Sequence, residues 1–234
     1  MSKKRDFDNF DEFAADYRDK HNESLGLSGA DSHFFSEFKI LQLLRHEEAT
    51  ATLKILDFGC GDGNSSAYIR EHFPNSSIYG IDVSQESIDQ ATNKQLVGAE
   101  FSSFDGQTLP YDDGEFDVVF TSMVFHHINH DRHPAMVKEI YRVTKQKGRF
   151  YNFEHNPYNP LTNKVVRECE FDQDAVLLKP GYHRKMTDSQ GFSIDQLTYI
   201  FFVPRHWLLK PLVPLEPLLG WCPLGAQYYV KATK

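Results

Sequence analysis

The chain contains 234 residues, of which 40% are hydrophobic, and it carries a formal net charge of -8. A chain of this size buries one full core, so we expect a single domain over residues 1–234. The acidic balance argues against a nucleic-acid partner, because affinity for a phosphate backbone depends on Lys and Arg. The three cysteines have neither metal-binding spacing nor an even count, and Met1 to Phe13 lacks the apolar segment of a secretory signal. We therefore expect a cytoplasmic location.

Two amphipathic helices are predicted before residue 50. The first, over residues 7–22, places Phe7, Phe10, Phe13, Ala14 and Tyr17 on one face, and the second, over residues 32–48, places Phe34, Phe38, Leu41 and Leu44 on one face. Aromatic faces of this kind usually pack on a core, which is the interpretation we prefer for all of them except Tyr17. For Tyr17, packing and a role at a ligand site are equally good interpretations.

The segment from Leu53 to Asp82 organises the rest of the chain. It begins with an apolar run typical of a strand buried in a parallel sheet, and the run stops at three closely spaced glycines, Gly59, Gly61 and Gly63. A helix and a second strand, over residues 77–81, follow these glycines. Asp82 then lies near the position from which a nucleotide-binding βαβ unit presents a carboxylate to ribose hydroxyls.

The remaining elements alternate between helices and strands. A helix begins after Ser84 and runs to about Asn93, strands are predicted at residues 99–104, 116–120 and 149–154, and a helix over residues 136–144 is closed by Gly148. A further helix at residues 161–171 precedes strands at residues 193–203 and 226–232. This alternation predicts an α/β fold with a doubly wound, mostly parallel sheet, helices on both faces, and ligands at the carboxyl ends of the strands.

Two residues indicate which nucleoside this unit binds. A dinucleotide fold has the pattern G-x-G-x-x-G, whose third glycine falls at position 64, and that residue is Asn64. The carboxylate of Asp57 would repel a pyrophosphate, whereas it would attract an ammonium group. S-adenosylmethionine joins adenosine to a zwitterionic amino acid, so the sequence favours this ligand over a nicotinamide dinucleotide.

The motifs LDFGCGDG, GIDVS and FSSFDGQTLPYDDGEFDVVFTSMVFHHI together resemble the class I S-adenosylmethionine-dependent methyltransferases, in the small-molecule branch that includes ubiquinone and menaquinone biosynthesis enzymes. The resemblance implies a Rossmann-like sheet of seven strands with an antiparallel last strand. It divides the chain into a helical lid (1–50), a cofactor-binding core (51–154) and a substrate side (155–234). Besides Asp57 and Gly63, the cofactor contacts it implies are Gly59, Cys60 and Gly61 at the methionine part, Asp82 at the ribose, Val83 at the adenine, Asp105 with Gly106 at the adenine amino group, and the Thr121 backbone at the methionine ammonium.

Polar side chains collect after the strands at residues 116–120 and 149–154. Four histidines, at positions 126, 127, 130 and 133, follow the first of these strands. A metal site is the less favoured interpretation, because no cysteine accompanies them, and we predict none. We expect His126 to face the cofactor and the other three to be solvated. The second strand leads into Glu154, His155 and Asn156, which are either substrate contacts or caps of the strand end.

The connection PRHWLLKPLVPLEPLLGWCPLG, residues 204–225, is apolar but interrupted. Its five prolines predict that no continuous helix forms, and its charged residues exclude a membrane-spanning segment. Its leucines and tryptophans either pack on the protein's own core or form an apolar lip that receives a lipid-linked or aromatic acceptor, or a dimer contact. A monomer, a homodimer and a peripheral membrane contact are all compatible with this segment.

These observations predict a methyltransferase that acts on a small-molecule, lipid-linked or sugar-linked acceptor, at oxygen rather than at nitrogen or carbon. His126 or His155 is expected to act as base, with Glu154 orienting or replacing it, and Tyr17 and Asn156 are expected to contact the substrate. The alternative is a catalytically inactive protein that binds S-adenosylmethionine for regulation or as a scaffold. A third class, a nicotinamide dehydrogenase, is disfavoured by Asp57 and by the glycine pattern.

Overall fold

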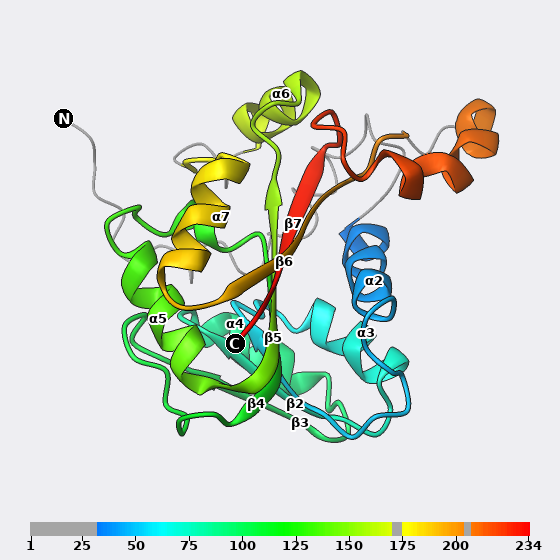
Figure 1. The fold of residues 1–234 in the computed structure, drawn as a ribbon. Coiled ribbons are helices and arrows are strands. Elements are labelled where there is room, and N and C mark those ends of the chain that lie inside the picture. Colours follow the sequence, from blue (N-terminus) through cyan, green and yellow to red (C-terminus); the bar gives the residue numbers. More distant parts are fainter. Residues whose placement is uncertain (1–31, 170–174, 204–206) are drawn as a thin grey trace.

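One sheet of seven strands forms the centre of the protein (Figure 1). The computed structural model describes residues 32–169, 175–203 and 207–234. The strands are β1 (Lys54–Phe58), β2 (Ser77–Asp82), β3 (Ala99–Ser103), β4 (Phe116–Ser122), β5 (Thr144–His155), β6 (Ser193–Ile200) and β7 (Gln227–Thr233), in the order β3-β2-β1-β4-β5-β7-β6. All neighbouring pairs among β1 to β5 are parallel, whereas β7 is antiparallel to both β5 and β6. The predicted mostly parallel sheet with an antiparallel last strand is confirmed.

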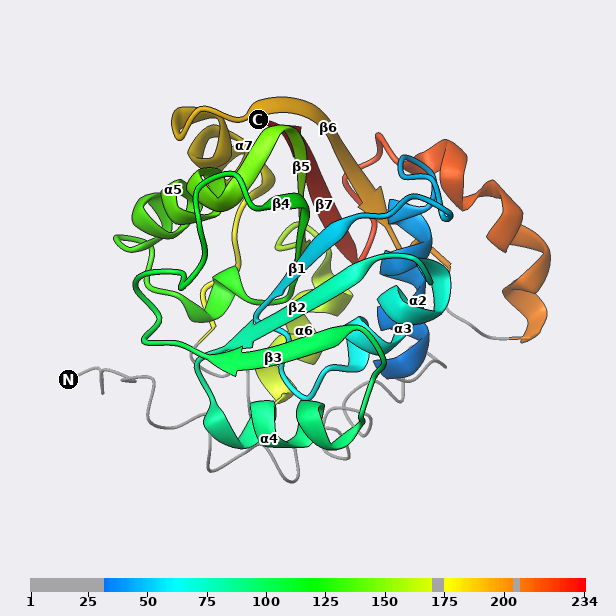
Figure 2. The same ribbon diagram turned by 90° about the horizontal axis from the view of Figure 1, so that it is seen from below.

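Helices cover both faces of this sheet, as the alternating pattern predicted. The helices are α2 (Ser32–Leu43), α3 (Asn64–His72), α4 (Gln85–Asn93), α5 (His133–Val143), α6 (Pro160–Glu168) and α7 (Pro180–Ser189), with 3₁₀ helices η4 (Phe125–His127) and η6 (Trp207–Leu219). Helices α2 and α3 lie on one face, and α5 and α7 lie on the other (Figure 1). Helix α4 lies beside the edge of the sheet formed by β2 and β3 (Figure 2). Because β4 and β5 are parallel, the long connections that follow them start from the same end of the sheet.

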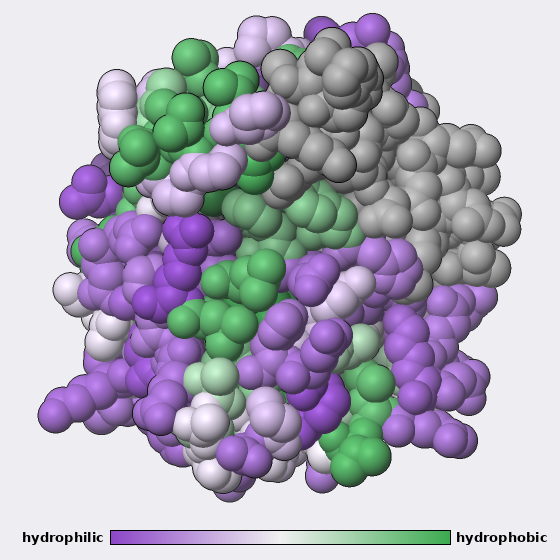
Figure 3. Space-filling model, turned by 90° about the vertical axis from the view of Figure 1, so that its right-hand side faces the viewer, coloured by the Kyte–Doolittle hydropathy of each residue, from purple (hydrophilic) through white to green (hydrophobic). Residues whose placement is uncertain are grey.

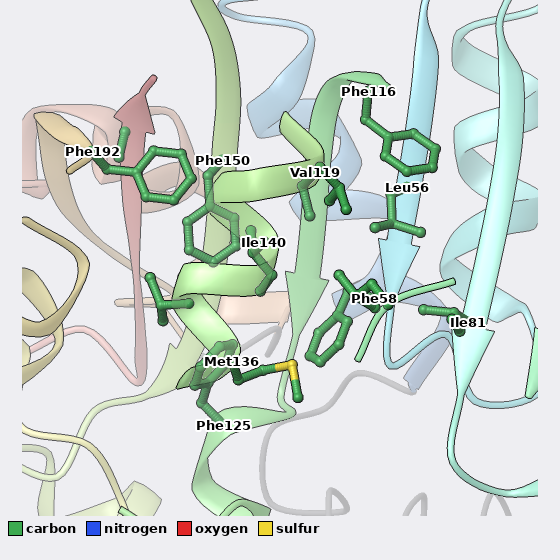
Figure 4. Packing of buried hydrophobic residues seen from close by; sticks show 14 of the residues in the cluster. Leu56, Phe58, Ile81, Phe116, Val119, Phe125, Met136, Ile140, Phe150 and Phe192 are labelled. Carbon is green, nitrogen blue, oxygen red and sulfur yellow. The ribbon is translucent and has the colours of Figure 1, made fainter. Parts of the chain in front are cut away.

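The central strands bury side chains on both faces, which explains their nearly continuous apolar sequences. Leu56 and Phe58 of β1 point toward α5, where they pack with Val119, Ile140 and other apolar side chains (Figure 4). Ile55, which directly precedes Leu56, points to the opposite face and belongs to the cluster on the α2 and α3 side. Two apolar clusters, one on each face, thus hold the sheet between its helices.

The segment that precedes β1 is fixed to the sheet by packing and by one buried carboxylate. Helix α2 ends at Leu43, earlier than the predicted residue 48, and its most buried positions include Lys39, whereas Leu41 is exposed. Phe34, Phe38 and Leu44 pack against the apolar cluster on this face as predicted, and the prediction was wrong for Leu41. Glu47 is buried and accepts hydrogen bonds from the guanidinium of Arg149 and the hydroxyl of Tyr151. The predicted helix over residues 7–22, with Tyr17, lies outside the described residues.

Several predicted boundaries need correction. Helix α5 ends at Val143, and β5 begins at Thr144 because it already pairs there with β4, so Gly148 lies inside a strand and does not close the helix. Helix α7 was not predicted, since few of its residues are apolar. The proline-rich connection does form a continuous helix, η6, of the 3₁₀ type. Its internal prolines are spaced by three residues, which places them on one side of a helix with three residues per turn.

Candidate active site

The glycine loop after β1 is held against the end of β2. The backbone N–H of Gly59 donates to the carbonyl of Ile81 at 2.8 Å, and the N–H of Cys60 donates to the same oxygen at 3.1 Å. Gly59 has a φ of 72°, and a Cβ added there would overlap the side chain of Val124, so this position requires glycine. Gly61 faces open space instead, and its N–H donates to Asp82 Oδ2 at 2.9 Å. The loop therefore offers a bare backbone surface between β1 and β2.

Asp57 lies buried directly beneath this loop. The hydroxyl of Ser66 donates a hydrogen bond to Asp57 Oδ2 at 2.6 Å. Burial raises the pKa of Asp57 to about 7, the hydrogen bond from Ser66 lowers it, and the nearby charge of Asp82 raises it further. A cation from outside the chain would stabilise the ionised form of this buried carboxyl group, because a nearby positive charge lowers the pKa that burial has raised. The surroundings of Asp57 therefore suit an ammonium group, and its contact with the cofactor stays a prediction.

Two further acids continue along the carboxyl ends of β2 and β3. Asp82 accepts the Gly61 N–H with one oxygen and the Ser84 N–H, at 3.0 Å, with the other, so backbone contacts orient its carboxylate. Asp105 is exposed, and its Oδ1 accepts hydrogen bonds from the backbones of Thr108 and Gln107, which lower its pKa. Both acids are thus oriented by local backbone contacts, as suits acceptors of ligand hydrogen bonds.

The other predicted cofactor residues lie around these acids. Val83 is half-buried next to Asp82, and the carbonyl of Gly106 accepts a hydrogen bond from Arg132 at 2.8 Å. Gly63 begins α3 with a φ of 77°. Thr121 is fully buried near the end of β4, where it pairs with Phe58 of β1. The bare loop, the buried acid and the oriented acids together fit an adenosine that carries a charged amino acid.

A buried histidine–carboxylate pair lies at the ends of β4 and β5. His126 Nδ1 is 2.7 Å from Glu154 Oε2, and both side chains are almost completely buried. The other oxygen of Glu154 accepts the backbone N–H of Phe125 at 2.8 Å. Burial alone would raise the pKa of Glu154, but the charge and hydrogen bond of His126, with smaller effects from His183 and His155, lower it below its usual value. Glu154 is therefore a carboxylate that fixes both the ring of His126 and the helix η4 that carries it.

Three more side chains extend this buried polar cluster. The ring of His155 lies 5.2 Å from that of His126, centroid to centroid. Tyr228 of β7 pairs with Glu154 in the sheet, and its hydroxyl lies 3.2 Å from His183 Nδ1. Burial lowers the pKa of His183 to about 4, with the charge of Glu154 opposing this, so the ring is neutral at physiological pH. Helix α7 and strand β7 thus complete a site that the sequence assigned only to the ends of β4 and β5.

Comparison with known proteins identifies the family. A model of a methyltransferase domain matches residues 55–148. The malonyl-[acyl-carrier protein] O-methyltransferase of Herminiimonas arsenicoxydans is 30% identical over 209 residues, which are 83% of this chain and 75% of that protein. The chain belongs to the S-adenosylmethionine-dependent methyltransferases. The predicted family, its enzymatic class and its cofactor, S-adenosylmethionine, are thereby confirmed.

Two further comparisons agree with this assignment. The fatty-acid O-methyltransferase of Mycolicibacterium smegmatis is 26% identical over 145 residues, covering 60% of this methyltransferase and 52% of that protein. The solved structure of an S-adenosylmethionine-dependent methyltransferase from Archaeoglobus fulgidus has the same fold, with a TM-score of 0.68 at 16% identity over 87% of this chain and 95% of the other.

The histidines of this methyltransferase differ in their surroundings. His130 is exposed, as expected, and His127 is half-buried. The expectation that His133 is solvated was wrong. Its ring is fully buried, with Nε2 2.8 Å from the carbonyl of Phe125 and 2.9 Å from that of Ile128. His133 contacts the carbonyl of the first residue of η4 and that of the residue just after this helix, and it thereby ties α5 to the site.

Asn156 joins the end of β5 to the segment that follows η6. Its amide nitrogen donates to the carbonyls of Pro223 and Gly225, and its amide oxygen accepts the N–H of Tyr158. The side chain is buried and holds the turn together. A substrate contact by Asn156 stays a prediction, and the visible role of this residue in the methyltransferase is to position the chain next to η6.

Sequence reasoning did not single out Lys39 of α2. Its Nζ donates to the hydroxyl of Ser122, at the end of β4, over 2.8 Å, and the side chain is only 4% exposed. The available signal was its position four residues after Phe35 and four before Leu43, on the buried side of a helix.

Among the described residues, no group of three or more His, Cys, Asp or Glu side chains is placed to hold a metal ion.

Proposed function

We propose that this methyltransferase transfers the methyl group of S-adenosylmethionine to a hydroxyl oxygen of an acceptor with an apolar chain, and that His126 removes the hydroxyl proton. The observation that carries this proposal is the buried contact of 2.7 Å between His126 Nδ1 and Glu154 Oε2. A hydroxyl keeps its proton at neutral pH, so its methylation benefits from a base beside the reacting oxygen. The oxygen specificity is also supported by the two relatives named as O-methyltransferases.

The state of Glu154 determines which nitrogen of His126 acts. An ionised carboxylate only accepts hydrogen bonds, so Nδ1 of His126 carries a proton and donates it to Glu154. In the neutral form of the ring, Nε2 is then the nitrogen that takes the proton from the acceptor. Once His126 becomes positively charged, the adjacent carboxylate stabilises it. Glu154 acts through His126 and is therefore a positioning residue.

The cofactor half follows from the geometry of the glycine loop. S-adenosylmethionine supplies an electrophilic methyl group on a sulfonium that is already a good leaving group. Asp57 is suited to its ammonium group, the backbone of Gly61 to its amino-acid part, and Asp82 to the ribose hydroxyls. Asp105 at the end of β3 is suited to the adenine amino group. Since the protein offers oriented groups on both reactants, most of the acceleration comes from alignment.

An apolar surface near the end of β5 supports an acceptor with an apolar chain. Helix η6 and the turn after it expose the large apolar side chains Leu212, Leu215, Leu218, Trp221 and Leu224, which we call the apolar lip. Apolar atoms gather in the upper part of the view from this side, above a largely polar surface (Figure 3). Trp221 is 78% exposed, so packing on the protein's own core does not account for it. Relatives that act on malonyl-acyl carrier protein and fatty acids also support an acyl acceptor.

A pocket beside α6 provides a second support. It has a volume of about 410 Å³, and its described lining consists of Pro160, Asn163, Val166, Arg167, Ala175 and Leu177. Val176 lies between Ala175 and Leu177, and its N–H donates a hydrogen bond to the carbonyl of His126 at 3.0 Å. This hydrogen bond links one wall of the pocket to the backbone of the proposed base, which supports an acyl chain bound on this side of the site.

The cysteines and the apolar lip bear on the location and the partners. The three cysteines, all within the described residues, form no disulfide, which suits a reducing cytoplasm. Among the described helices, none is both long enough and apolar enough to cross a bilayer. The apolar lip would allow peripheral contact with a lipid surface or with a second copy of the chain.

The proposal is tested with cofactor that carries a labelled methyl group. We expect label in 3-hydroxydodecanoate, much less in 3-hydroxybutyrate, which keeps the hydroxyl without the chain, and none in decane-1-thiol or decylamine. Label in the amine alone would refute oxygen specificity. If the protein binds S-adenosylhomocysteine but methylates none of a broad set of acyl, aromatic and sugar acceptors, the alternative of an inactive binding protein is correct.

A further inference from the structure

Lys39 is a buried cation whose hydrogen-bonding capacity is mostly unused. An ammonium group has three N–H donors, and within the described part of the chain the Nζ of Lys39 makes one hydrogen bond, to Ser122 Oγ at 2.8 Å. No carboxylate of the described residues lies within 4.0 Å of it, although the charge of Glu154 acts on it from farther away. Lysine is almost never fully buried without a partner.

The position of Lys39 has an energetic cost in the ligand-free protein. Burial lowers the pKa of Lys39 to about 7, and the charge of Glu154 only partly opposes this effect. A methionine of similar length at this position would avoid the cost, because it has no charge to desolvate. Among the described residues no group accepts the other two N–H donors of Lys39 or lies within ion-pair distance of it, which points to an anion that arrives from outside the chain.

Lys39 lies where the two reactants of the proposed function meet. Ser122 is the last residue of β4, next to Thr121, which pairs with Phe58 at the start of the glycine loop. On its other side Ser122 pairs with Phe153, which precedes Glu154 on β5. The ammonium is thus placed between the loop assigned to the methionine part and the histidine pair assigned to the acceptor.

We infer that Lys39 binds a carboxylate, either that of the methionine part of the cofactor or one carried by the acceptor. A carboxylate accepts the two remaining N–H groups in charge-assisted hydrogen bonds. It supplies the counter-ion that this buried ammonium otherwise lacks. The inference rests on the proposed positions of cofactor and acceptor, and the test below separates its failure from theirs.

The first arm of the test compares two nucleosides. S-adenosylhomocysteine carries the amino-acid group, and 5′-methylthioadenosine is a similar thioether without it. If the carboxylate is that of the cofactor, Lys39→Met weakens S-adenosylhomocysteine binding at least tenfold in calorimetry and leaves 5′-methylthioadenosine binding within twofold. The matched control is Lys138→Met, an exposed position on α5, which changes neither affinity.

The second arm tests the acceptor. With S-adenosylhomocysteine present, we compare the binding of dodecanoate and of dodecanol, which differ in the carboxylate. If the carboxylate is that of the acceptor, Lys39→Met weakens dodecanoate binding at least tenfold, and both nucleosides and dodecanol bind as before. In either case we expect the wild-type protein to take up protons when the carboxylate binds at pH 8, and Lys39→Met to take up none. Calorimetry in buffers of different ionisation enthalpy measures this proton uptake.

The proton measurement must exclude uptake by the other titratable groups on the neighbouring elements. They are Glu154 and His155 on β5, His126 on η4, and the ion pair of Glu37 and His72 on α2 and α3. Of these, only Glu154 has an electrostatic effect on Lys39. Since both variants keep all five groups, any difference in proton uptake between Lys39→Met and Lys138→Met belongs to Lys39.

Two results would overturn the inference. In the first, a Lys39→Met protein that melts like the wild type binds every carboxylate probe with unchanged affinity and proton uptake. In the second, the variant loses S-adenosylhomocysteine and 5′-methylthioadenosine to the same extent, so that the loss is not specific to the carboxylate. A wild-type protein that fails to methylate any acceptor while Lys39→Met still shows the selective loss refutes the proposed function and leaves the role of Lys39 intact.

Discussion

The proposed cofactor side and the proposed acceptor side of this protein are built in different ways. On the cofactor side, contacts join residues that are close in sequence: Ser66 with Asp57, nine residues apart, and Gly61 with Asp82, 21 apart. On the acceptor side, Lys39 contacts Ser122 across 83 residues, and His183 contacts Tyr228 across 45. The first is one strand–loop–helix–strand unit, and the second is assembled from α2, η4, α7, β5 and β7.

The two sides are therefore expected to respond differently to substitution. The cofactor side depends on backbone conformation, since Gly59 and Gly61 present main-chain groups that any alteration of the loop would move. The acceptor side depends on buried charges whose neighbours come from separate elements, such as Glu154 between His126 and His183. We therefore expect substitutions on the cofactor side to change ligand affinity, and substitutions on the acceptor side to change turnover or acceptor choice at constant cofactor affinity.

The largest effect is expected at His126. His126→Gln keeps a polar side chain but removes the base, so turnover of a hydroxyl acceptor should fall by roughly 10²- to 10⁴-fold, the usual contribution of a positioned base. Affinity for S-adenosylhomocysteine should be nearly unchanged, which initial rates and calorimetry will check together. His155→Gln tests the second predicted base, and His130→Gln, at an exposed position of the same segment, is the control. Near-normal turnover in both the His126 and His155 variants would show that alignment alone drives the transfer.

The second effect concerns stability and its pH dependence at Asp57. The pKa of Asp57 is raised to about 7 by burial, whereas an unfolded Asp titrates near pH ~4. The folded protein therefore holds this proton more tightly, and the free energy of unfolding of the ligand-free protein falls as pH rises from about 4 to about 7. Asp57→Asn should abolish this fall and be more stable than wild type at pH 8, by up to on the order of 4 kcal/mol at ~1.4 kcal/mol per pH unit.

Chemical denaturation at pH 5 and pH 8 measures this effect, with Asp112→Asn at an exposed position as control. The same Asp57→Asn variant should bind S-adenosylhomocysteine more weakly than wild type, because it has lost the charge that attracts the ammonium. A variant that is less stable at pH 8 and binds as well as wild type would contradict the assignment of Asp57 to the cofactor side.

The third effect is a loss of cofactor affinity at Asp82. Asp82→Ala removes a charged hydrogen-bond acceptor, so S-adenosylhomocysteine binding should weaken by roughly 1.5 to 3 kcal/mol. Part of this loss comes from the loop, because Asp82 also accepts the N–H of Gly61. Calorimetry on Asp82→Ala and on Asp188→Ala, an exposed acid on α7, measures the difference. Unchanged affinity in a folded Asp82→Ala protein would remove this residue from the ribose site.

The smallest effect is expected at the apolar lip. The double substitution Leu218→Ser and Trp221→Ser should raise KM for a long-chain acceptor by about 5- to 30-fold, since partial loss of two apolar contacts costs roughly 1 to 2 kcal/mol. KM for a short-chain acceptor and affinity for S-adenosylhomocysteine should not change. Val97→Ser, an exposed apolar position before β3, is the matched control. An equal change for both acceptors would leave the lip as a structural or dimer-forming surface.

The histidine pair was predictable only in part. His126 and Glu154 follow neighbouring strands, and parallel strands bring their carboxyl ends together, so their proximity could be expected. That His133 is buried could not, because its partners are carbonyls in and just after η4, a short helix without a sequence signal. The contribution of Tyr228 depends on β7 pairing with β5 across more than 70 residues of intervening chain, which no local pattern specifies.

The proposed cofactor side could be predicted from the sequence alone. The apolar run, the glycines and the acid that follows them are constraints of local backbone geometry, which a continuous segment of chain carries in its own residues. Only the tertiary structure decided the acceptor side, where Lys39, Glu154 and His183 derive their properties from burial and from each other's charge. The physical reason is that desolvation and electrostatic neighbours depend on long-range packing, and the same residue types at other positions in the fold would be ordinary solvated side chains.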